Sequence, residues 1–243
     1  MSTLAVIRSE WSKVWSLRST PWSLAATAVL TIAIGMLAVF ATEMHEGTPG
    51  SKTSASLTGF LIGQLAICVL GTLIATGEYT TGQIRVTLAA VPNRSRFLLA
   101  KATVAAAVAF SGGLAIGLAA FLAGQSVLGG QAASLTDPSV LRAILGVGLY
   151  SGVLGVFSLA VGFLIRHSAG AIATVIAVLY IGPIVLMLLG EFGEKLSEWW
   201  PTGAGARIMN PDAVDAWQGL AIFVGWTVVL LGGAWGVLRQ RDA

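Results

Sequence analysis

The chain has 243 residues, of which 56% are hydrophobic and 10% are charged, and its mean hydropathy is +0.84. So little polar sequence cannot cover a folded domain in water, which excludes an ordinary soluble protein. The net charge is +3, but the basic residues lie in short segments beside apolar stretches rather than in a basic region of their own. Such a distribution sets the topology of a membrane protein and gives no reason to expect nucleic-acid binding.

Six apolar stretches follow one another along the chain, and none carries a charged residue in its central part. They are residues 22–41, 58–76, 102–124, 143–165, 169–189 and 218–238. Each has about 20 residues, enough for a helix to cross the hydrocarbon core, and each is continuously apolar rather than alternating as in a barrel strand. The sequence therefore predicts an all-α polytopic membrane protein with six transmembrane helices in a single domain, residues 1–243.

Glycines recur four residues apart in several of these stretches, a spacing that allows helices to approach closely. The pairs are Gly59/Gly63, Gly113/Gly117, Gly148/Gly152 and Gly232/Gly236. Any one pair can also arise by chance in a chain with 30 glycines.

The basic residues predict the orientation. If both termini are cytoplasmic, 10 of the 14 lysines and arginines lie on the inner side, as the positive-inside rule requires. They are Arg8, Lys13, Arg18, Arg85, Arg94, Arg96, Lys101, Arg166, Arg239 and Arg241. The first stretch is too long for the apolar part of a signal peptide, so we expect it to be retained.

The residues before the first stretch carry apolar side chains at helical spacing, namely Leu4, Ile7, Trp11, Val14 and Trp15. We expect residues 1–20 to form an interfacial helix on the inner leaflet, with Pro21 separating it from the first span. The alternative is a basic tail anchored by two tryptophans.

Three outer connections between the stretches are long enough to describe. Residues 42–57 and 125–138 are predicted as outer loops. In residues 190–217, Phe192, Leu196 and Trp199 form an apolar stripe before Pro201 breaks the run. This pattern predicts a re-entrant segment in the outer leaflet, the alternative being an exposed amphipathic loop.

The longest inner connection is residues 77–101. Ile84, Leu88 and Val91 lie on one helical face, and Pro92 ends that helix before the following basic residues. The simplest reading is a loop that only sets topology, but its patterning predicts a short amphipathic helix.

The chain shows no sign of its own catalytic chemistry. His45 and His167 fall in predicted connections and Cys68 in a span, so neither a metal site nor a nucleophile with its base can be assembled. There is no glycine-rich phosphate loop, so ATP cannot bind through such a motif. We therefore expect that the chain is not an enzyme and that, if it does work, the energy comes from another polypeptide.

In the order of its predicted surface helix, six spans, patterned inner connection and broken outer segment, the chain resembles the ABC type-2 transporter permease family, in particular its actinobacterial members. The inner connection carries the main local likeness, through Glu78, Gly82, Leu88, Pro92 and Lys101. Further likeness lies in Glu10, Lys13, Arg18 and Trp22 near the start and in Pro201 and Asn210-Pro211 of the outer segment.

The resemblance implies a permease in the bacterial cell membrane that pairs with a second permease chain, identical or paralogous, to form a dimer. Separate nucleotide-binding ATPase subunits would hold ATP and Mg²⁺ on the inner side, and this chain would bind no cofactor. The inner connection would be the coupling segment, with Glu78 starting a helix whose Ile84 and Leu88 enter a groove on the ATPase. Its implied coupling residues are Glu78, Gly82, Ile84, Arg85 and Leu88, with Arg166 and His167 as a second contact.

The resemblance also implies a substrate pathway and an outer gate. Sparse polar candidates for the pathway are Gln64, Thr72, Thr174 and Tyr180, and the gate would use Phe192, Trp199, Trp200 and Pro201. So few polar groups favour export of an apolar or amphipathic cargo such as a drug, natural product or lipid. The alternatives are an ABC-type sensing or immunity module and an ATP-independent lipid-scrambling bundle.

Overall fold

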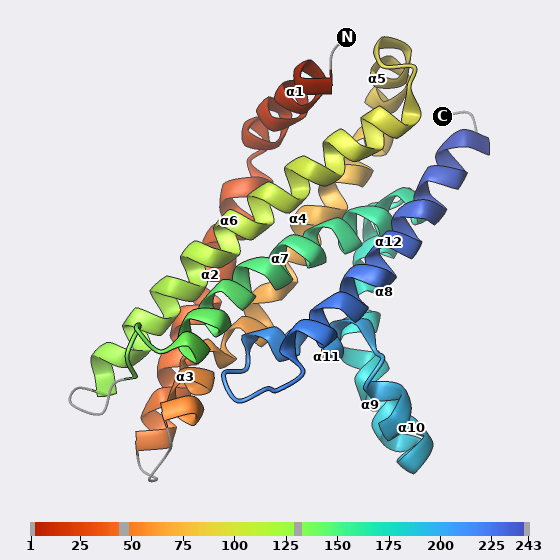
Figure 1. Cartoon of the computed structure of the whole chain (residues 1–243). Helices are drawn as coiled ribbons and strands as arrows, with labels where there is room; N and C mark the ends of the chain where they lie inside the picture. The colour runs from red at the N-terminus through yellow and green to blue at the C-terminus, as the bar shows by residue number, and fades with distance from the viewer. Residues whose placement is uncertain (1–2, 44–48, 129–132, 241–243) are drawn as a thin grey trace.

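The computed structural model describes residues 3–43, 49–128 and 133–240, and six of its helical segments are long and apolar enough to cross a membrane (Figure 1). These segments are α2 (Ser19–Glu43), α4 (Phe60–Thr80), α6 (Arg94–Leu128), α7 (Pro138–Ile165), α8 (Ser168–Ile176) with α9 (Gly182–Leu188), and α12 (Ala216–Gln240). The described residues contain no strand. The chain is an all-α polytopic membrane protein, and this prediction is confirmed.

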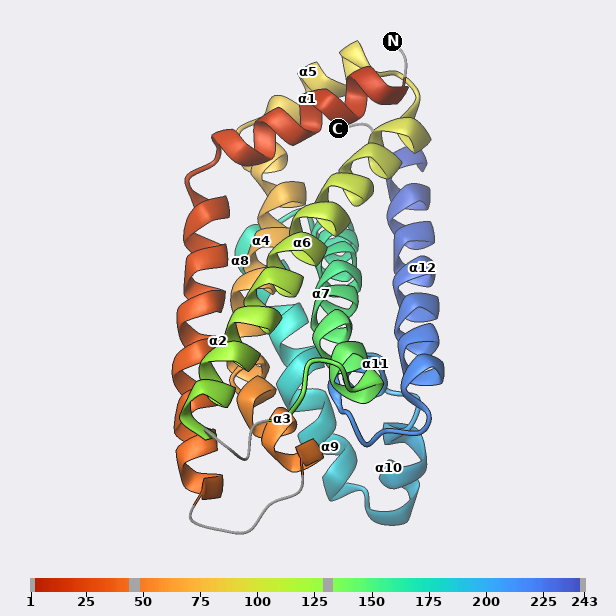
Figure 2. The same cartoon turned by 60° about the vertical axis from the view of Figure 1, so that its left-hand side comes forward.

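In the described residues, five short α-helices occupy the ends of the bundle and the connections. They are α1 (Thr3–Ser16), α3 (Pro49–Thr58), α5 (Gln83–Ala90), α10 (Gly190–Ser197) and α11 (Pro201–Ala206). α1, α5 and both ends of the described chain lie at one end of the bundle, whereas α3 and α10 lie at the other (Figure 2). We call these the α5 end and the α10 end.

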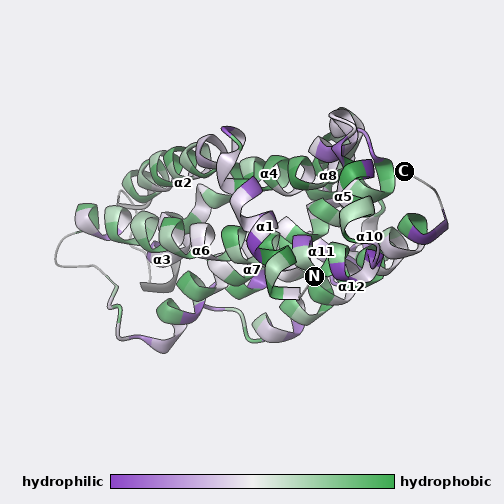
Figure 3. Ribbon diagram, turned by 90° about the horizontal axis from the view of Figure 1, so that it is seen from above, coloured by the Kyte–Doolittle hydropathy of each residue, from purple (hydrophilic) through white to green (hydrophobic). Residues whose placement is uncertain are grey.

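α7 is the central helix. In the most apolar part of α7, 78% of the residues are buried, whereas the share is 22% in the corresponding parts of α2, α8–α9 and α12. α7 packs against α4, α6, α8 and α12. Seen from above, most of α2 is hydrophobic, and its outward face would lie in lipid (Figure 3).

Glycine explains how closely some spans approach. A Cβ built on Gly59 would lie 2.1 Å from the carbonyl oxygen of Thr31 in α2, and one on Gly113 would lie 2.2 Å from Oγ of Ser151 in α7. The first three predicted glycine pairs therefore lie at helix contacts. A Cβ built on Gly232 or Gly236 would meet nothing within 4 Å, so the fourth pair does not lie at a helix contact among the described residues.

The helices are longer than the apolar stretches that predicted them. α6 begins at Arg94, where the Asn93 side chain accepts a hydrogen bond from the Arg96 amide at 3.1 Å, and continues through Leu128. The predicted loops are correspondingly shorter: residues 49–58 form α3, and residues 77–80 complete α4. His45 lies outside the described residues.

The predicted helix before the first span is present, but its boundary and buried face differ from the prediction. The turn falls at Leu17 and Arg18, and Pro21 lies in the first turn of α2, where it removes no intrahelical hydrogen bond. The buried face of α1 consists of Val6, Glu10 and Val14. Leu4, Trp11 and Trp15 are exposed, as expected for an apolar face turned toward lipid.

Which end faces the cytoplasm can be tested with cysteine labels in a Cys68→Ala background. Ser9 on α1 and Ser197 on α10 are both exposed and lie at opposite ends. From the charge distribution we expect an impermeant maleimide to label Ser197→Cys on intact cells, and Ser9→Cys only after permeabilisation. Labelling of Ser9→Cys on intact cells would reverse the orientation.

Candidate functional site

The α5 end carries the strongest candidate site, and α5 is its most prominent element. α4 runs through Glu78 to Thr80, and Gly82 then adopts a left-handed φ of +70° that only glycine takes without strain, so that α5 turns away from α4. Glu78 therefore lies in the last turn of α4 and does not begin the short helix, which starts at Gln83. The prediction of a short helix is correct, but its predicted start is wrong.

The apolar face of α5 packs against the chain itself. Ile84 is 4% exposed and belongs to a buried cluster with Val6 and Val14 of α1 and Phe97 of α6, and Leu88 packs against the same cluster. The expectation that Ile84 enters a groove on another protein is therefore wrong, because its own chain already buries it. Leu88 is only partly buried, and its contact with a partner stays a prediction.

Beneath α5, four charged side chains from three helices form a buried ion cluster, which consists of Glu10, Lys13, Glu78 and Lys101. Lys101 Nζ on α6 lies 2.7 Å from Glu10 Oε2 and 3.0 Å from Glu78 Oε1. Lys13 Nζ lies 2.7 Å from Glu10 Oε1 and 2.9 Å from Glu78 Oε1. Both carboxylates thus bridge both ammonium groups, and the cluster ties α1 to α4 and α6.

The cluster is balanced in charge, which explains how it tolerates burial. The side chains of Glu10, Glu78 and Lys101 are 2%, 7% and 3% exposed. Burial alone would raise the pKa of the Glu10 carboxyl, but Lys101 and Lys13 outweigh it and hold this pKa below its ordinary value. For Lys13, burial would lower the pKa, but hydrogen bonds to Glu10 and Glu78 raise it overall. Glu10 and Lys13 are therefore expected to be charged near neutral pH.

A cavity of about 250 Å³ adjoins the cluster, and Lys13, Leu17, Leu73 and Gln83 are among its lining residues. Glu78 also lines it, and its Oε2 is buried without a hydrogen-bond partner in the described part of the chain. This oxygen leaves the cluster one acceptor that a donor from a ligand could satisfy.

The predicted second contact, Arg166 and His167, joins α7 to α8 at the same end of the bundle. Arg166 has φ +60°, its guanidinium lies 5.3 Å from the Tyr79 ring centroid, and its Nη2 donates to the Val237 carbonyl at 3.3 Å. His167 is exposed, and its Nδ1 accepts from the Gly170 amide at 3.3 Å, which caps α8. Arg166 is thus held by its own chain, whereas His167 is accessible.

Of the four predicted pathway residues, the structure brings two together. Tyr150 on α7 donates to Gln64 Oε1 at 2.8 Å, and Gln64 Nε2 lies 3.4 Å from the hydroxyl of Tyr180. Tyr180 also donates to the Leu61 carbonyl. Thr72 is fully buried and Thr174 is exposed on α8, so neither belongs to this polar triad of Gln64, Tyr150 and Tyr180.

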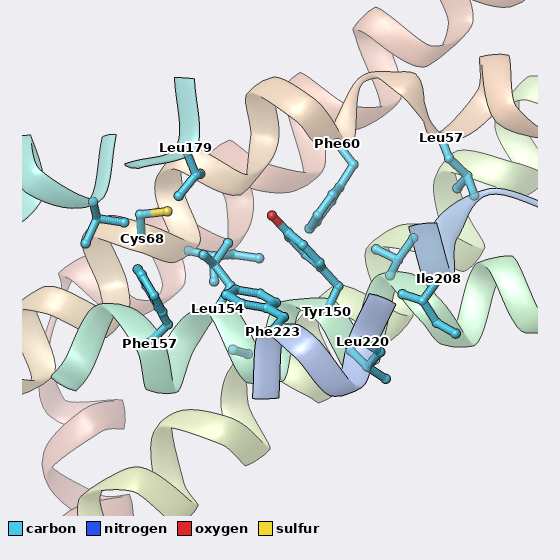
Figure 4. Packing of buried hydrophobic residues seen from close by; sticks show 14 of the residues in the cluster. Leu57, Phe60, Cys68, Tyr150, Leu154, Phe157, Leu179, Ile208, Leu220 and Phe223 are labelled. Carbon is cyan, nitrogen blue, oxygen red and sulfur yellow. The ribbon is translucent and has the colours of Figure 1, made fainter. Parts of the chain in front are cut away.

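Aromatic side chains surround the triad. The ring of Tyr150 lies between those of Phe60 and Phe223, with centroids 5.9 and 5.3 Å away (Figure 4). Tyr150 was not predicted from sequence, because a lone tyrosine in an apolar stretch gives no signal of its polar partners. The triad is thus a small polar centre inside an aromatic and aliphatic core.

The predicted outer segment folds back into the bundle. Pro201 starts α11, and Ala204 and Ile208 after it are fully buried between α7 and α12. α10 lies at the end of the bundle beside α9, and its Phe192, like Trp199 after it, is largely exposed. The re-entrant part is therefore α11 and the following turn, whereas Phe192 and Trp199 face outward.

Trp200 connects this segment to the fifth span. Residues 177–181 form a π-helical turn between α8 and α9, and Trp200 Nε1 donates to the Val178 carbonyl in that turn at 2.9 Å. A Cβ on Gly182 would lie 2.2 Å from the indole of Trp200, so the ring packs directly on the glycine. Such π-helical turns are frequent at functional sites.

No group of three or more metal-ligating side chains occurs within residues 3–43, 49–128 and 133–240. The described residues thus contain two polar centres, the ion cluster beneath α5 and the triad in the core.

Comparison with protein-family models and with curated proteins found no match for this chain.

Proposed function

We propose that this chain is the permease subunit of an ABC transporter in a bacterial cell membrane. It exports an apolar or amphipathic substrate with energy from ATP that a separate nucleotide-binding subunit hydrolyses. The observation that supports this function best is α5, a short helix exposed at one end of the bundle and fixed from below to the spans.

α5 has the exposed face that a docking helix needs. Arg85 and Ala89 are exposed, and Val86 is 70% exposed although it is apolar. The opposite face is anchored through Ile84, and the ion cluster lies directly beneath it. A displacement of α5 by a partner would therefore pass to α4 and α6, because α5 is joined to both by short connections. A segment that only sets topology requires none of this packing.

The exposed side of the fifth span supports a pathway shared between two chains. α8 packs against α4 and α7, which leaves Thr174 exposed and Tyr180 half-buried. A second permease chain facing this surface would enclose a passage with the triad beside it. Because the triad is the main polar centre on that side of the core, an apolar or amphipathic cargo fits better than a hydrophilic one.

The docking role of α5 is testable with the double variant Arg85→Glu/Val86→Asp, which reverses charge on the exposed face without touching Ile84. We expect binding of a separate nucleotide-binding ATPase subunit to fall about tenfold or more, since charge at the core of an interface is strongly unfavourable. ATP-driven transport in proteoliposomes should fall in parallel.

The matched control is Arg8→Glu/Ser12→Asp, which makes the same change of charge at exposed positions of α1. If Arg85→Glu/Val86→Asp binds the ATPase as well as the unmodified chain does, the docking role of α5 is contradicted. ATP-dependent binding without substrate efflux would favour a sensing or immunity module, and lipid movement without the ATPase would favour a scrambling bundle.

A further inference from the structure

The fifth span changes its hydrogen-bond register at the π-helical turn, residues 177–181. The Gly182 amide donates to the Ala177 carbonyl, five residues back rather than four. In this register the amide of residue 183 would donate to the Val178 carbonyl. Residue 183 is a proline, which has no N–H. The backbone of the span therefore supplies no donor to the Val178 carbonyl in this register.

Trp200 supplies the missing donor from outside the span. Its Nε1 donates to the Val178 carbonyl at 2.9 Å, and its ring packs on Gly182. A membrane span tolerates a proline where a neighbouring group satisfies the carbonyl that the proline leaves free. The indole thus takes the place of one backbone hydrogen bond, and the bonding across the turn is completed by a side chain that follows α10.

The residues beyond the turn form a compact unit, which we call the arm. The arm is residues 182–199 and contains α9 and α10. Its two helices pack tightly, since a Cβ on Gly193 would overlap the Leu186 carbonyl oxygen. Among the described helices, α9 packs mainly against α10 and the π-helical turn, and Met187 and Leu188 are 83% and 80% exposed. The arm is therefore firm within itself and weakly packed against the other spans.

The arm is held to the bundle near its two ends. At its start, Tyr180 of the π-helical turn donates to the Leu61 carbonyl on α4. At its end, Trp226 Nε1 on α12 donates to the Trp199 carbonyl at 3.1 Å. The bond from Trp200 to Val178 joins these two ends to each other, because Val178 lies in the turn and Trp200 directly follows the arm.

We propose that the π-helical turn is a pivot about which the arm swings as one unit, and that Trp200 is the catch that holds the arm in the position that the structure shows. When the indole withdraws, the Val178 carbonyl loses its donor, and Pro183 prevents the backbone from replacing that bond. The proline thus keeps the span from closing into a continuous helix at this point, which leaves the arm releasable.

Hydrogen–deuterium exchange of the full-length chain in detergent, followed by mass spectrometry, tests the catch. Trp200→Phe keeps an aromatic ring beside Gly182 but removes the donor. We expect amides throughout residues 184–198 to exchange about tenfold faster, because an unpaired carbonyl destabilises the held position. Amides of α8, before the pivot, should exchange as in the unmodified chain. The matched control Trp217→Phe makes the same change at a largely exposed tryptophan on α12 and should alter no exchange rate in the arm.

Pro183→Ala separates the hydrogen bond from the packing of the ring. Alanine restores an N–H that can donate to the Val178 carbonyl, so the double variant Trp200→Phe/Pro183→Ala should exchange about as slowly as the unmodified chain. If Trp200 acts through packing alone, this rescue fails, because alanine at position 183 does not replace the indole ring.

Four results would overturn the proposal. They are unchanged exchange in Trp200→Phe, no rescue in the double variant, faster exchange confined to the amides next to residue 200, and faster exchange in all six spans together. The third would mean that the arm does not move as a unit. The fourth, with a lower unfolding temperature than that of Trp217→Phe, would mean that Trp200 stabilises the whole bundle and is not a catch for the arm.

Discussion

Replacing Lys101 by methionine should lower the free energy of unfolding by about 3–5 kcal/mol, because it leaves two buried carboxylates with one ammonium group between them. Lys101 Nζ lies 2.7 Å from Glu10 Oε2, 3.0 Å from Glu78 Oε1 and 3.3 Å from the Ile74 carbonyl oxygen. Methionine fills a similar volume, so the cost comes mainly from uncompensated charge. α1 should detach first, since it contacts the spans chiefly through α6 and this cluster.

Thermal unfolding in detergent, followed by tryptophan fluorescence, measures the effect. Lys195→Met is the matched control, because Lys195 is exposed on α10, and its unfolding midpoint should hardly change. The double variant Glu10→Gln/Lys101→Met removes one charge of each sign and should recover part of the loss. Equal midpoints for Lys101→Met and Lys195→Met would show that the cluster contributes nothing to stability.

The same cluster predicts how stability depends on pH. The pKa of Glu10 in the folded chain lies below its ordinary value of 4.5, so its stabilising contribution is present above pH 4.5 and is lost as the pH falls through the folded pKa. The pKa of Lys13 lies above its ordinary value of 10.5, so its contribution is present below pH 10.5 and is lost as the pH rises further. The unfolding midpoint should therefore be nearly constant from about pH 5.5 to about 9.5 as far as Glu10 and Lys13 are concerned.

The six spans could be predicted because each is a local property of the sequence, an apolar run of membrane length. Their ends were less predictable, because a helix continues as long as its backbone bonds can form, and polar residues do not interrupt it. α6 shows this, since Arg94, Arg96 and Lys101 all lie within the helix although they precede its apolar part.

The ion cluster could not be predicted, because Glu10, Glu78 and Lys101 come from three segments that only the fold brings together. The only local signal for an ion pair was the spacing of Glu10 and Lys13, which lie three residues apart on one helix. The apolar face of α5 also depends on contacts that the local sequence does not specify. The spacing of Ile84 and Leu88 correctly predicted an apolar face that is covered, but periodicity cannot tell whether the same chain or a partner covers it.

The re-entrant segment shows the same division between local and non-local information. Pro201 and the preceding apolar residues signalled a break near the outer surface. The hydrogen bond from Trp200 to the Val178 carbonyl could not be predicted, since the π-helical turn that contains Val178 has no sequence pattern of its own. The close contact of α11 with α12 depends on Gly219, because a Cβ there would meet the carbonyl oxygen of Ala204 in α11.

Replacing Gly219 by valine should therefore displace α11 from the bundle and lower the free energy of unfolding by about 2–3 kcal/mol. A Cβ on Gly219 would lie 2.2 Å from the carbonyl oxygen of Ala204, and backbone cannot yield as a flexible side chain can. Ala204 is fully buried, so its displacement also opens the core around Phe223.

Gly225→Val on the same helix is the matched control, because nothing lies within 4 Å of a Cβ there and the intrinsic effect of valine on α12 is the same. We expect Gly219→Val to unfold at a clearly lower temperature than Gly225→Val. If α11 also closes the exit of the pathway, Gly219→Val proteoliposomes should leak an amphipathic dye that Gly225→Val proteoliposomes retain. Equal unfolding temperatures for the two variants would mean that α11 is not held against α12 as the structure describes. Equal retention of dye by the two variants would mean that the packing of α11 does not close the pathway.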